Sequence, residues 1–239
     1  MSKFVNKTLT AGCAILSLAL LVCPGCRNPD TQARGDKGPA SQADSQSPLQ
    51  TRATAEGQPY DFYLLNLSWS PEFCATHDGS PECASHPGFV VHGLWPQSND
   101  GSYPQYCGRR PGPTSDSVWA GLMPTASLAM HEWQTHGACT PYDADTYFGL
   151  IRRAFGEVHI PPALTNTTQQ TMEPPAAIID SFAQNNAGFP SGSIALSCGN
   201  NYLTAIEVCF DKSLNPIACS NVRTCRANVV KIPPQNSAQ

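Results

Sequence analysis

Two short blocks of the chain hold most of the residues that can move a proton near neutral pH. The first block is Gly88-Phe-Val-Val-His92-Gly-Leu-Trp95-Pro-Gln97, and the second is His131-Glu132-Trp133-Gln134-Thr135-His136-Gly137-Ala138-Cys139. Because histidine titrates near neutral pH, a pair of histidines can supply both the base and the acid of one reaction. Tryptophan offers a flat face on which a planar ligand can stack. The blocks therefore predict acid/base cleavage of a substrate that contains nucleobases.

The spacing inside the second block suggests how its side chains cooperate. Glu132 lies four residues before His136, so the two share a face if the segment is helical. Glu132 would then orient the imidazole of His136 or raise its pKa. A zinc hydrolase is the rival enzyme class, since His131-Glu132 begins the motif His-Glu-x-x-His. The motif requires histidine where Thr135 stands, and His136 lies about 140° from His131 around a helix axis, so no metal site is predicted.

Strands and helices are both expected around these blocks. A segment rich in aromatic and apolar residues predicts a strand over 60–69, and a second strand is expected over 88–92, with His92 at its end. Because the two kinds of element do not alternate regularly, we expect an α+β fold with a central antiparallel sheet, packed helices and disulfide cross-links. The other expected strands are 193–198, 202–210 and 217–219, and the expected helices are 115–122, 127–136, 143–158 and 174–185.

The first 57 residues differ from the rest of the chain. A charged start and an uncharged, mostly apolar run from Thr8 to Val22 predict a secretory signal over 1–26. Cys26 follows Gly25, so it is either the lipidated first residue of a lipoprotein or part of an ordinary cleaved signal. Residues 27–57 contain a single leucine and no aromatic residue, which predicts a disordered tether. The catalytic domain would span 58–239 of an exported protein, periplasmic or extracellular, free or lipid-anchored at a membrane.

Cysteine usage also indicates export. Eleven cysteines are present, and three of them lie in the signal region. The remaining eight include no Cys-x-x-Cys pair, which predicts a disulfide framework in an oxidising compartment rather than a zinc site. Short separation favours Cys74 with Cys83 and Cys209 with Cys219, and a disulfide is the expected role of the two cysteines next to the proposed chemistry. The eight are Cys74, Cys83, Cys107, Cys139, Cys198, Cys209, Cys219 and Cys225.

The charge balance argues against a basic nucleic-acid-binding surface. The whole chain has 14 basic and 18 acidic residues, and removing a signal that contains Lys3 and Lys7 leaves 12 against 18, a net charge of −6. A protein that holds a polyanion by surface charge is usually basic. This chain would have to use local contacts, and its affinity for long nucleic acid should be modest.

The two blocks resemble the signature blocks of the ribonuclease T2 family, in particular its secreted or periplasmic bacterial members. The resemblance rests on Phe89-Val-Val-His92-Gly-Leu-Trp95-Pro96 and His131-Glu132-Trp133-x-x-His136-Gly137-x-Cys139, and it continues through Trp69-Ser-Pro and the last four cysteines to cover residues 60–232. It implies an α+β fold and an endoribonuclease without metal or other cofactor. The ribose 2′-hydroxyl of single-stranded RNA, and not DNA, would attack the adjacent phosphorus, giving a 2′,3′-cyclic phosphate and a 5′-hydroxyl. A monomer is expected.

The resemblance also implies a role for each residue of the blocks. His136 would be the base, His92 the acid, and His131 a donor to the phosphate. Trp95 and Tyr103 would stack a base and Gln97 would tune its preference, with broad base specificity expected because stacking tolerates any base. A structural role is the alternative for Trp95, and Trp133 is expected to lie in the core.

One residue departs from the family pattern. The second block of the family usually carries a lysine immediately before its last histidine, and here Thr135 takes that place. Losing one donor to the phosphorane could reduce turnover by up to about 10²–10³ unless Arg109, Arg110 or a charged His131 substitutes. A secreted RNA-binding or toxin-like module with reduced or lost catalysis is therefore the alternative function.

Overall fold

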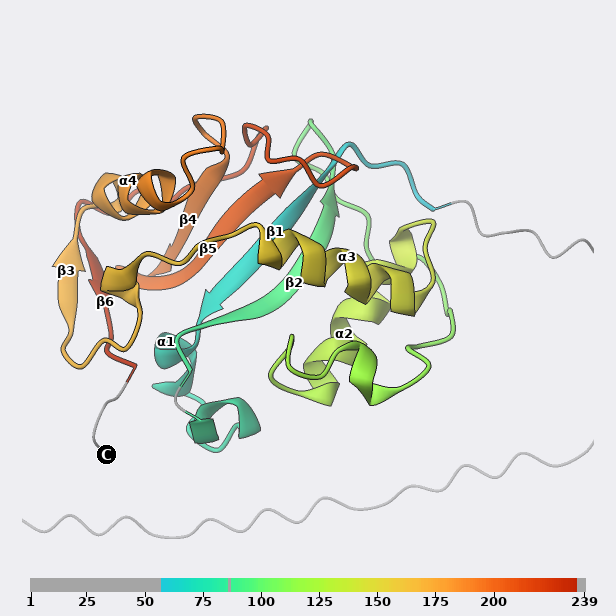
Figure 1. The fold of residues 1–239 in the computed structure, drawn as a ribbon, viewed down its shortest axis with the longest axis horizontal. Coiled ribbons are helices and arrows are strands. Elements are labelled where there is room, and N and C mark those ends of the chain that lie inside the picture. Colours follow the sequence, from blue (N-terminus) through green and yellow to red (C-terminus); the bar gives the residue numbers. More distant parts are fainter. Residues whose placement is uncertain (1–56, 86, 236–239) are drawn as a thin grey trace, which may run out of the picture. The chain divides into compact units, whose positions relative to one another are not determined.

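The computed structural model describes residues 57–85 and 87–235 (Figure 1). Residues 1–56 lie outside the described residues. They include the predicted signal over 1–26 with Cys26 and all of the predicted tether except Gly57. In the described part, none of the helices has both the length and the apolar character needed to cross a membrane.

A six-stranded mixed sheet forms the centre of the fold, as expected for the α+β class (Figure 1). The order is β2-β1-β5-β6-β3, with β4 also paired to β5, and every pair is antiparallel except β5 with β6. The strands are β1 (Phe62–Trp69), β2 (Phe89–Gln97), β3 (Thr171–Glu173), β4 (Ile194–Gly199), β5 (Tyr202–Phe210) and β6 (Val230–Ile232).

Residues of β1 alternate strictly between two environments. Tyr63, Leu65 and Leu67 belong to the main hydrophobic core, whereas Asn66 and Ser68 line a cavity on the opposite face. Successive side chains of a strand point to opposite faces, so this period of two separates an apolar face from a more polar one. The helix α2 (Ala126–Thr135) lines the same cavity through Ser127, Leu128 and His131.

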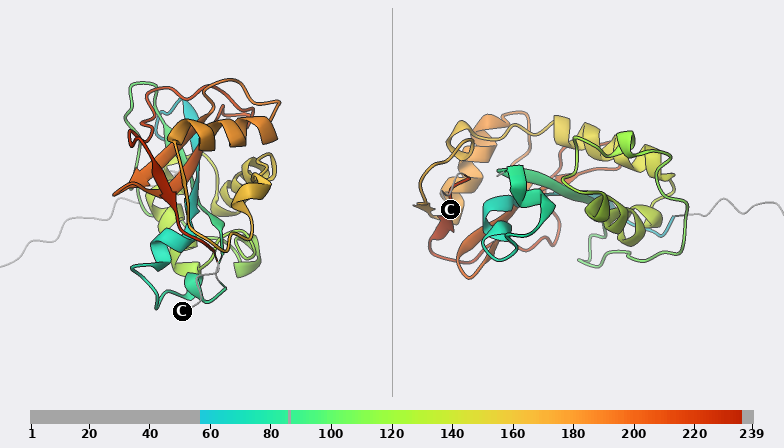
Figure 2. Two further views of the ribbon diagram at one scale, coloured as in Figure 1. Left: turned by 90° about the vertical axis from the view of Figure 1, so that its left-hand side faces the viewer. Right: turned by 90° about the horizontal axis from the view of Figure 1, so that it is seen from below.

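Helices cover the apolar face. α3 (Ala144–Gly156) and α4 (Pro175–Asn185) lie on the same side of the sheet (Figure 2), and Phe148, Ile151 and Phe182 join the core beneath them. α1 (Ser70–Cys74) follows β1, and α2 carries most of the second block. The short 3-10 turns are η1 (Pro81–Ser85), η2 (Asp116–Val118), η3 (Gly137–Cys139) and η4 (Pro162–Leu164).

A β-bulge places the first block on the polar face. Val91 and Gly93 pair with adjacent residues of β1, so His92 between them is the extra residue of the bulge. In a regular strand, residues three apart point to opposite faces, and the sheet would separate His92 from Trp95. The bulge lets both side chains line the same cavity.

All eight predicted cysteines are paired. Cys74–Cys83 and Cys209–Cys219 are the pairs that short separation favours, and Cys107–Cys139 joins the two cysteines near the proposed chemistry. Cys198–Cys225 is the fourth disulfide and links β4 to the segment after β5. The disulfide framework is therefore confirmed.

Most expected elements agree with the structure within two residues at each end, and one boundary is wrong. The second strand does not end at His92, because β2 continues to Gln97. Pro96 lies within this longer strand although proline cannot donate a ladder hydrogen bond. β2 is an edge strand with a partner on one side only, where a proline is accommodated. Trp95 and Gln97 are consequently held by the sheet.

Two further expected elements are absent. The segment 115–122 forms only the 3-10 turn η2, because Gly121 has a φ of +70° and leaves the helical path. The segment 217–219 is not a strand, since the chain touches β5 only through an isolated bridge between Phe210 and Pro216. β3 and β6 were not expected, and three residues each are too few to show a period of two.

Candidate active site

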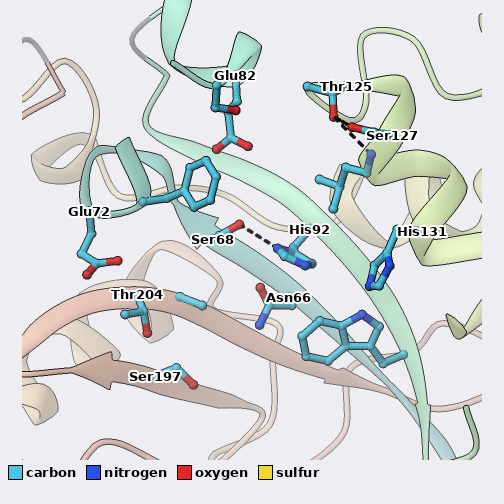
Figure 3. Close-up of a pocket in the computed structure, with 15 residues that line it drawn as sticks. Asn66, Ser68, Glu72, Glu82, His92, Thr125, Ser127, His131, Ser197 and Thr204 are labelled. Atoms are coloured by element: carbon cyan, nitrogen blue, oxygen red, sulfur yellow. Dashed lines mark hydrogen bonds between the residues drawn. The ribbon is translucent and has the colours of Figure 1, made fainter. Parts of the chain in front are cut away.

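His92 is held from two sides on the polar face of the sheet. Its Nδ1 lies 3.4 Å from Ser68 Oγ on the neighbouring strand, as drawn in Figure 3. Its Nε2 lies 3.4 Å from Glu132 Oε1 of α2, which makes a salt bridge when the imidazole is protonated. About 39% of the His92 side chain remains exposed, so the ring is oriented by protein groups and still accessible to a ligand.

Glu132 is almost fully buried and connects the two blocks. One carboxylate oxygen accepts a hydrogen bond of 2.7 Å from Trp95 Nε1, and the other faces His92. Its hydrogen bonds therefore go to the first block, and it acts on His136 only through its charge, which raises the pKa of that imidazole. Hydrogen bonds to a carboxylate that is buried in this way are among the stronger ones in proteins.

Gly93 leaves the space that this carboxylate occupies. A Cβ on Gly93 would lie 2.0 Å from Glu132 Oε2 and 2.6 Å from Trp95 Nε1. Any larger residue would displace the carboxylate from both of its partners. The glycine between His92 and Trp95 thus serves the site by its small size.

His136 is buried at the end of α2. Its backbone N–H donates to the Glu132 carbonyl at 2.9 Å, and its Nδ1 has no hydrogen-bond partner among the described residues. Desolvation lowers its pKa below the usual value, the charge of Glu132 opposes this, and His131 and His92 add to the lowering. A neutral imidazole is the form that can accept a proton.

Trp95 lies between the two imidazoles. Its ring centroid is 5.7 Å from that of His92 and 5.3 Å from that of His136. The two imidazoles are therefore at most about 11 Å apart, which is the sum of those two distances. The two histidines predicted to be the base and the acid, His136 and His92, therefore lie beside one side chain.

Two adjoining cavities of about 560 and 570 Å³ meet at this point. The first, the His92 cavity, contains His92 and is shown in Figure 3, and the second, the His136 cavity, contains His136. Trp95, His131 and Ser197 line both cavities, so the two are halves of one cleft with the imidazoles on either side.

The residues predicted to bind a base lie in the His136 cavity. Trp95, Gln97 and Tyr103 line it, and the half-exposed ring of Tyr103 lies 6.5 Å from that of His136. Thr135, at the position of the family's lysine, lines the same cavity. The segment that carries Tyr103 is fixed by the Cys107–Cys139 disulfide and by a 2.8 Å hydrogen bond from Tyr106 N to the carbonyl of Thr135.

Thr135 is buried, and its hydroxyl has no hydrogen-bond partner among the described residues. The two arginines expected as substitutes for the missing lysine lie elsewhere. Arg110 stacks on Trp133 at 5.3 Å and donates to two backbone carbonyls. Arg109 and Arg110 both line another cavity, which is not part of the cleft. His131, which lines both halves of the cleft, is the expected substitute that does reach it. Trp133 is buried, as expected.

The floor of the cleft contains two polar residues that were not predicted to belong to the site, Asn66 and Glu207. Asn66 pairs with Glu207 across β1 and β5, and its amide donates to the Glu207 carboxylate at 3.2 Å. Burial raises the pKa of Glu207, and hydrogen bonds from Ser197 and Asn66 oppose this. The sequence does contain a pattern that could have indicated these residues. Glu207 is the single acid in the apolar strand 202–210, and Asn66 and Ser68 interrupt the apolar strand 60–69.

Part of the described residues, from 60 to 219, matches the ribonuclease T2 family. The chain belongs to the ribonuclease T2 family. It is 44% identical over 91 residues to a ribonuclease of Aeromonas hydrophila, a match that covers 37% of this chain and 42% of that relative. It is 27% identical over 197 residues to ribonuclease DdI of Dictyostelium discoideum, covering 71% of this chain and 83% of the relative.

A solved structure supports the fold. RNase NT in complex with 5′-AMP has a TM-score of 0.55 at 19% identity, with 74% of this chain and 100% of that chain covered. At this identity the likeness shows the fold alone. The family match confirms the resemblance and the enzyme class of a ribonuclease T2 protein, and the solved structure agrees with the α+β fold.

Proposed function

We propose that the protein is a metal-independent endoribonuclease that cleaves single-stranded RNA by attack of the ribose 2′-hydroxyl on the adjacent phosphorus. The bond from phosphorus to the 5′-oxygen breaks, which leaves a 2′,3′-cyclic phosphate and a 5′-hydroxyl. The observation that carries the proposal is the contact of one indole, Trp95, with both His92 and His136 in a single cleft.

The environments of the two imidazoles support different roles. His136 is buried and has a lowered pKa, so it is neutral near pH 7 and can take the proton from the 2′-hydroxyl. His92 is oriented by Ser68 and Glu132 and delivers the proton to the leaving 5′-oxygen. His131 lies where the two halves of the cleft meet and donates to the phosphate between them. The proton taken by one histidine is matched by the proton given by the other.

The lining of the His136 cavity supports broad base specificity. Trp95 and Tyr103 offer aromatic faces, and stacking of this kind contributes roughly 1–3 kcal/mol per base whatever the base is. Gln97 adds an amide that can hydrogen-bond to a base edge. RNase NT, which shares the fold, is described with bound 5′-AMP, and this supports a nucleotide as the ligand.

We further propose that the protein is exported and works as a monomer. Four disulfides form and persist in an oxidising compartment, and this supports a periplasmic or extracellular location. Lipidation at Cys26 is the additional proposal that would hold the enzyme at a membrane, and mass spectrometry of the mature N-terminus would test it.

One observation favours a second candidate function, an RNA-binding module with little catalysis. Thr135 replaces the usual lysine. Among the arginines and lysines of the described residues, Arg223 alone lines the His136 cavity beside it. The His92→Ala/His136→Ala variant separates the two candidates. A binder keeps its biological effect in this variant, and an enzyme loses it.

The direct experiment is incubation of the purified protein with RNA and with the same sequence as DNA, both in EDTA, followed by identification of the product ends. Cleavage of RNA alone with cyclic phosphate ends is expected. Cleavage of DNA, or activity that EDTA removes, contradicts the mechanism. The His92→Ala/His136→Ala protein, purified in parallel, excludes a contaminating nuclease.

A further inference from the structure

The two ends of the cleft carry opposite charge. Beyond His92, the lining includes Glu72 and Glu82 and no arginine or lysine. Beyond His136, the lining includes Arg223, which also lines a third cavity together with Arg226. Besides the histidines, the other charged group of the His136 cavity is the buried Glu207, whose carboxylate accepts hydrogen bonds from Asn66 and Ser197. The phosphates of an RNA substrate would therefore be repelled by the carboxylates at one end of the cleft and attracted by the arginines at the other.

The acidic end is built from the segment after β1. Glu82 of η1 accepts a hydrogen bond of 2.5 Å from Ser70, and Glu72 lies on α1; Figure 3 shows both residues beside the cavity. The Cys74–Cys83 disulfide closes this segment and fixes the position of both carboxylates. Neither forms an ion pair with a described residue, so their charges are not neutralised locally.

The basic end is built from the segment that follows Cys219. Arg223 and Arg226 are exposed, and within the described ranges neither forms an ion pair. The Cys198–Cys225 disulfide ties the segment to β4 between these two arginines. Asp100 lines the same third cavity, and its carboxylate is occupied by hydrogen bonds from Ser102 N and Oγ at 2.8 and 2.6 Å.

The proposed mechanism gives the cleft a direction. If His136 takes the 2′-proton, the nucleotide on the 5′ side of the cleaved bond lies in the His136 cavity. If His92 protonates the 5′-oxygen, the leaving nucleoside lies in the His92 cavity. Phosphates further toward the 5′ end then run toward Arg223 and Arg226, and a phosphate on the 3′ side of the leaving nucleoside runs toward Glu72.

We propose that Arg223 and Arg226 form a binding site for the phosphate on the 5′ side of the cleaved nucleotide, and that Glu72 and Glu82 disfavour a phosphate on the leaving nucleoside. The enzyme then prefers the last linkage at a 3′-hydroxyl end over internal linkages of a chain. This inference rests on the proposed function, because the direction of the substrate follows from the roles of the two histidines.

Three dinucleotides with one cleavable bond each test the proposal: ApA, pApA with a 5′-phosphate, and ApAp with a 3′-phosphate. Because only one linkage can react, the register of the substrate is fixed. We expect kcat/KM to rise about three- to tenfold from ApA to pApA and to fall by a similar factor from ApA to ApAp at low salt. Both differences should shrink in 0.5 M salt, since exposed charges are then screened.

Paired variants assign each effect to its residues. Arg223→Gln/Arg226→Gln should abolish the advantage of pApA over ApA, and Glu72→Gln/Glu82→Gln should abolish the disadvantage of ApAp. Arg153→Gln and Glu173→Gln are the matched controls, because both residues are exposed and line none of these cavities. The controls should leave all three ratios unchanged.

Equal kcat/KM values for the three dinucleotides at low salt, or ratios that the paired variants leave unchanged, overturn the proposal while the ribonuclease activity stands. Absence of any cleavage overturns the proposed function instead. In that case, calorimetry with the 2′-deoxy forms of the three dinucleotides, which cannot be cleaved, measures whether the two phosphate preferences exist in binding. The same order of affinities supports the proposal, and equal affinities overturn it.

Discussion

Gly93→Ala tests whether the position of the Glu132 carboxylate matters for catalysis. The added Cβ would lie 2.0 Å from Glu132 Oε2, well inside the normal contact distance of about 3.5–4 Å, so the carboxylate must move. Moving it breaks the 2.7 Å hydrogen bond from Trp95 and the 3.4 Å contact with His92. Because φ of Gly93 is not in the left-handed region, the backbone tolerates alanine and the effect is steric.

The size of the effect follows from the broken hydrogen bond. A hydrogen bond to a charged group contributes about 1.5–3 kcal/mol, and each 1.4 kcal/mol corresponds to about tenfold in rate. We expect Gly93→Ala to reduce kcat/KM on a dinucleotide by about 10- to 100-fold. Overpacking should also lower the free energy of unfolding by about 1–3 kcal/mol, which a denaturant titration measures.

Two controls make this prediction specific. Gly149→Ala in α3 meets nothing within 4 Å, so it should leave kcat/KM unchanged and add up to about 1 kcal/mol of stability. In a Glu132→Ala background the carboxylate is gone and only the 2.6 Å approach to Trp95 Nε1 remains, so Gly93→Ala should cost less further activity than it does in the wild type. Wild-type activity of Gly93→Ala, or a full additional loss in the Glu132→Ala background, would refute the reasoning.

The remaining predictions concern titration, stability and the missing lysine. The acidic limb of the pH profile of kcat/KM should lie below pH 6.5, because desolvation lowers the pKa of His136, and a limb above pH 6.5 contradicts this. Glu132→Gln should move the limb to still lower pH, because it removes the negative charge that raises the pKa of His136. Burial raises the pKa of Glu207, so its contribution to stability is present below the unfolded value near 4.5 and is lost as pH rises through the folded pKa. Glu207→Gln should therefore raise Tm at pH 7 and leave it unchanged at pH 4, and no gain at pH 7 contradicts the assignment. Thr135→Lys should keep activity, since its side chain can extend into the His136 cavity, and complete loss of RNA cleavage would show that this space is not available.

Which side chains gather in the cleft was largely predictable, because residue types and spacing along the chain indicate them. His92, Trp95 and three residues of the second block line the cleft, namely His131, Thr135 and His136. Glu132 and His136 lie one turn apart at the end of α2, as their spacing predicts. The partner of Glu132 was not predictable. Its contact with the first block depends on the bulge at His92 and on the space at Gly93, which no local pattern encodes.

Long-range features explain the remaining differences. β3 and β6 have three residues each, and only their pairing with each other and with β5 in the tertiary fold stabilises them as strands. The charge of the two cleft ends was also hidden, because Glu82 and Arg223 are far apart in the sequence and meet the cleft only through the fold. The net negative charge of the chain gave no indication that acidic and basic residues lie at opposite ends of the cleft, where they can orient a polyanion.

The most direct test of the account is a double-mutant comparison of His92→Ala, His136→Ala and the combined variant, with kcat/KM measured on one dinucleotide in EDTA. Residues that act as a unit on one bond show strongly non-additive losses. We predict that each single variant loses nearly all activity and that the combined variant is little worse than either. Independent, multiplicative losses would contradict the claim that the two imidazoles act together on one phosphodiester.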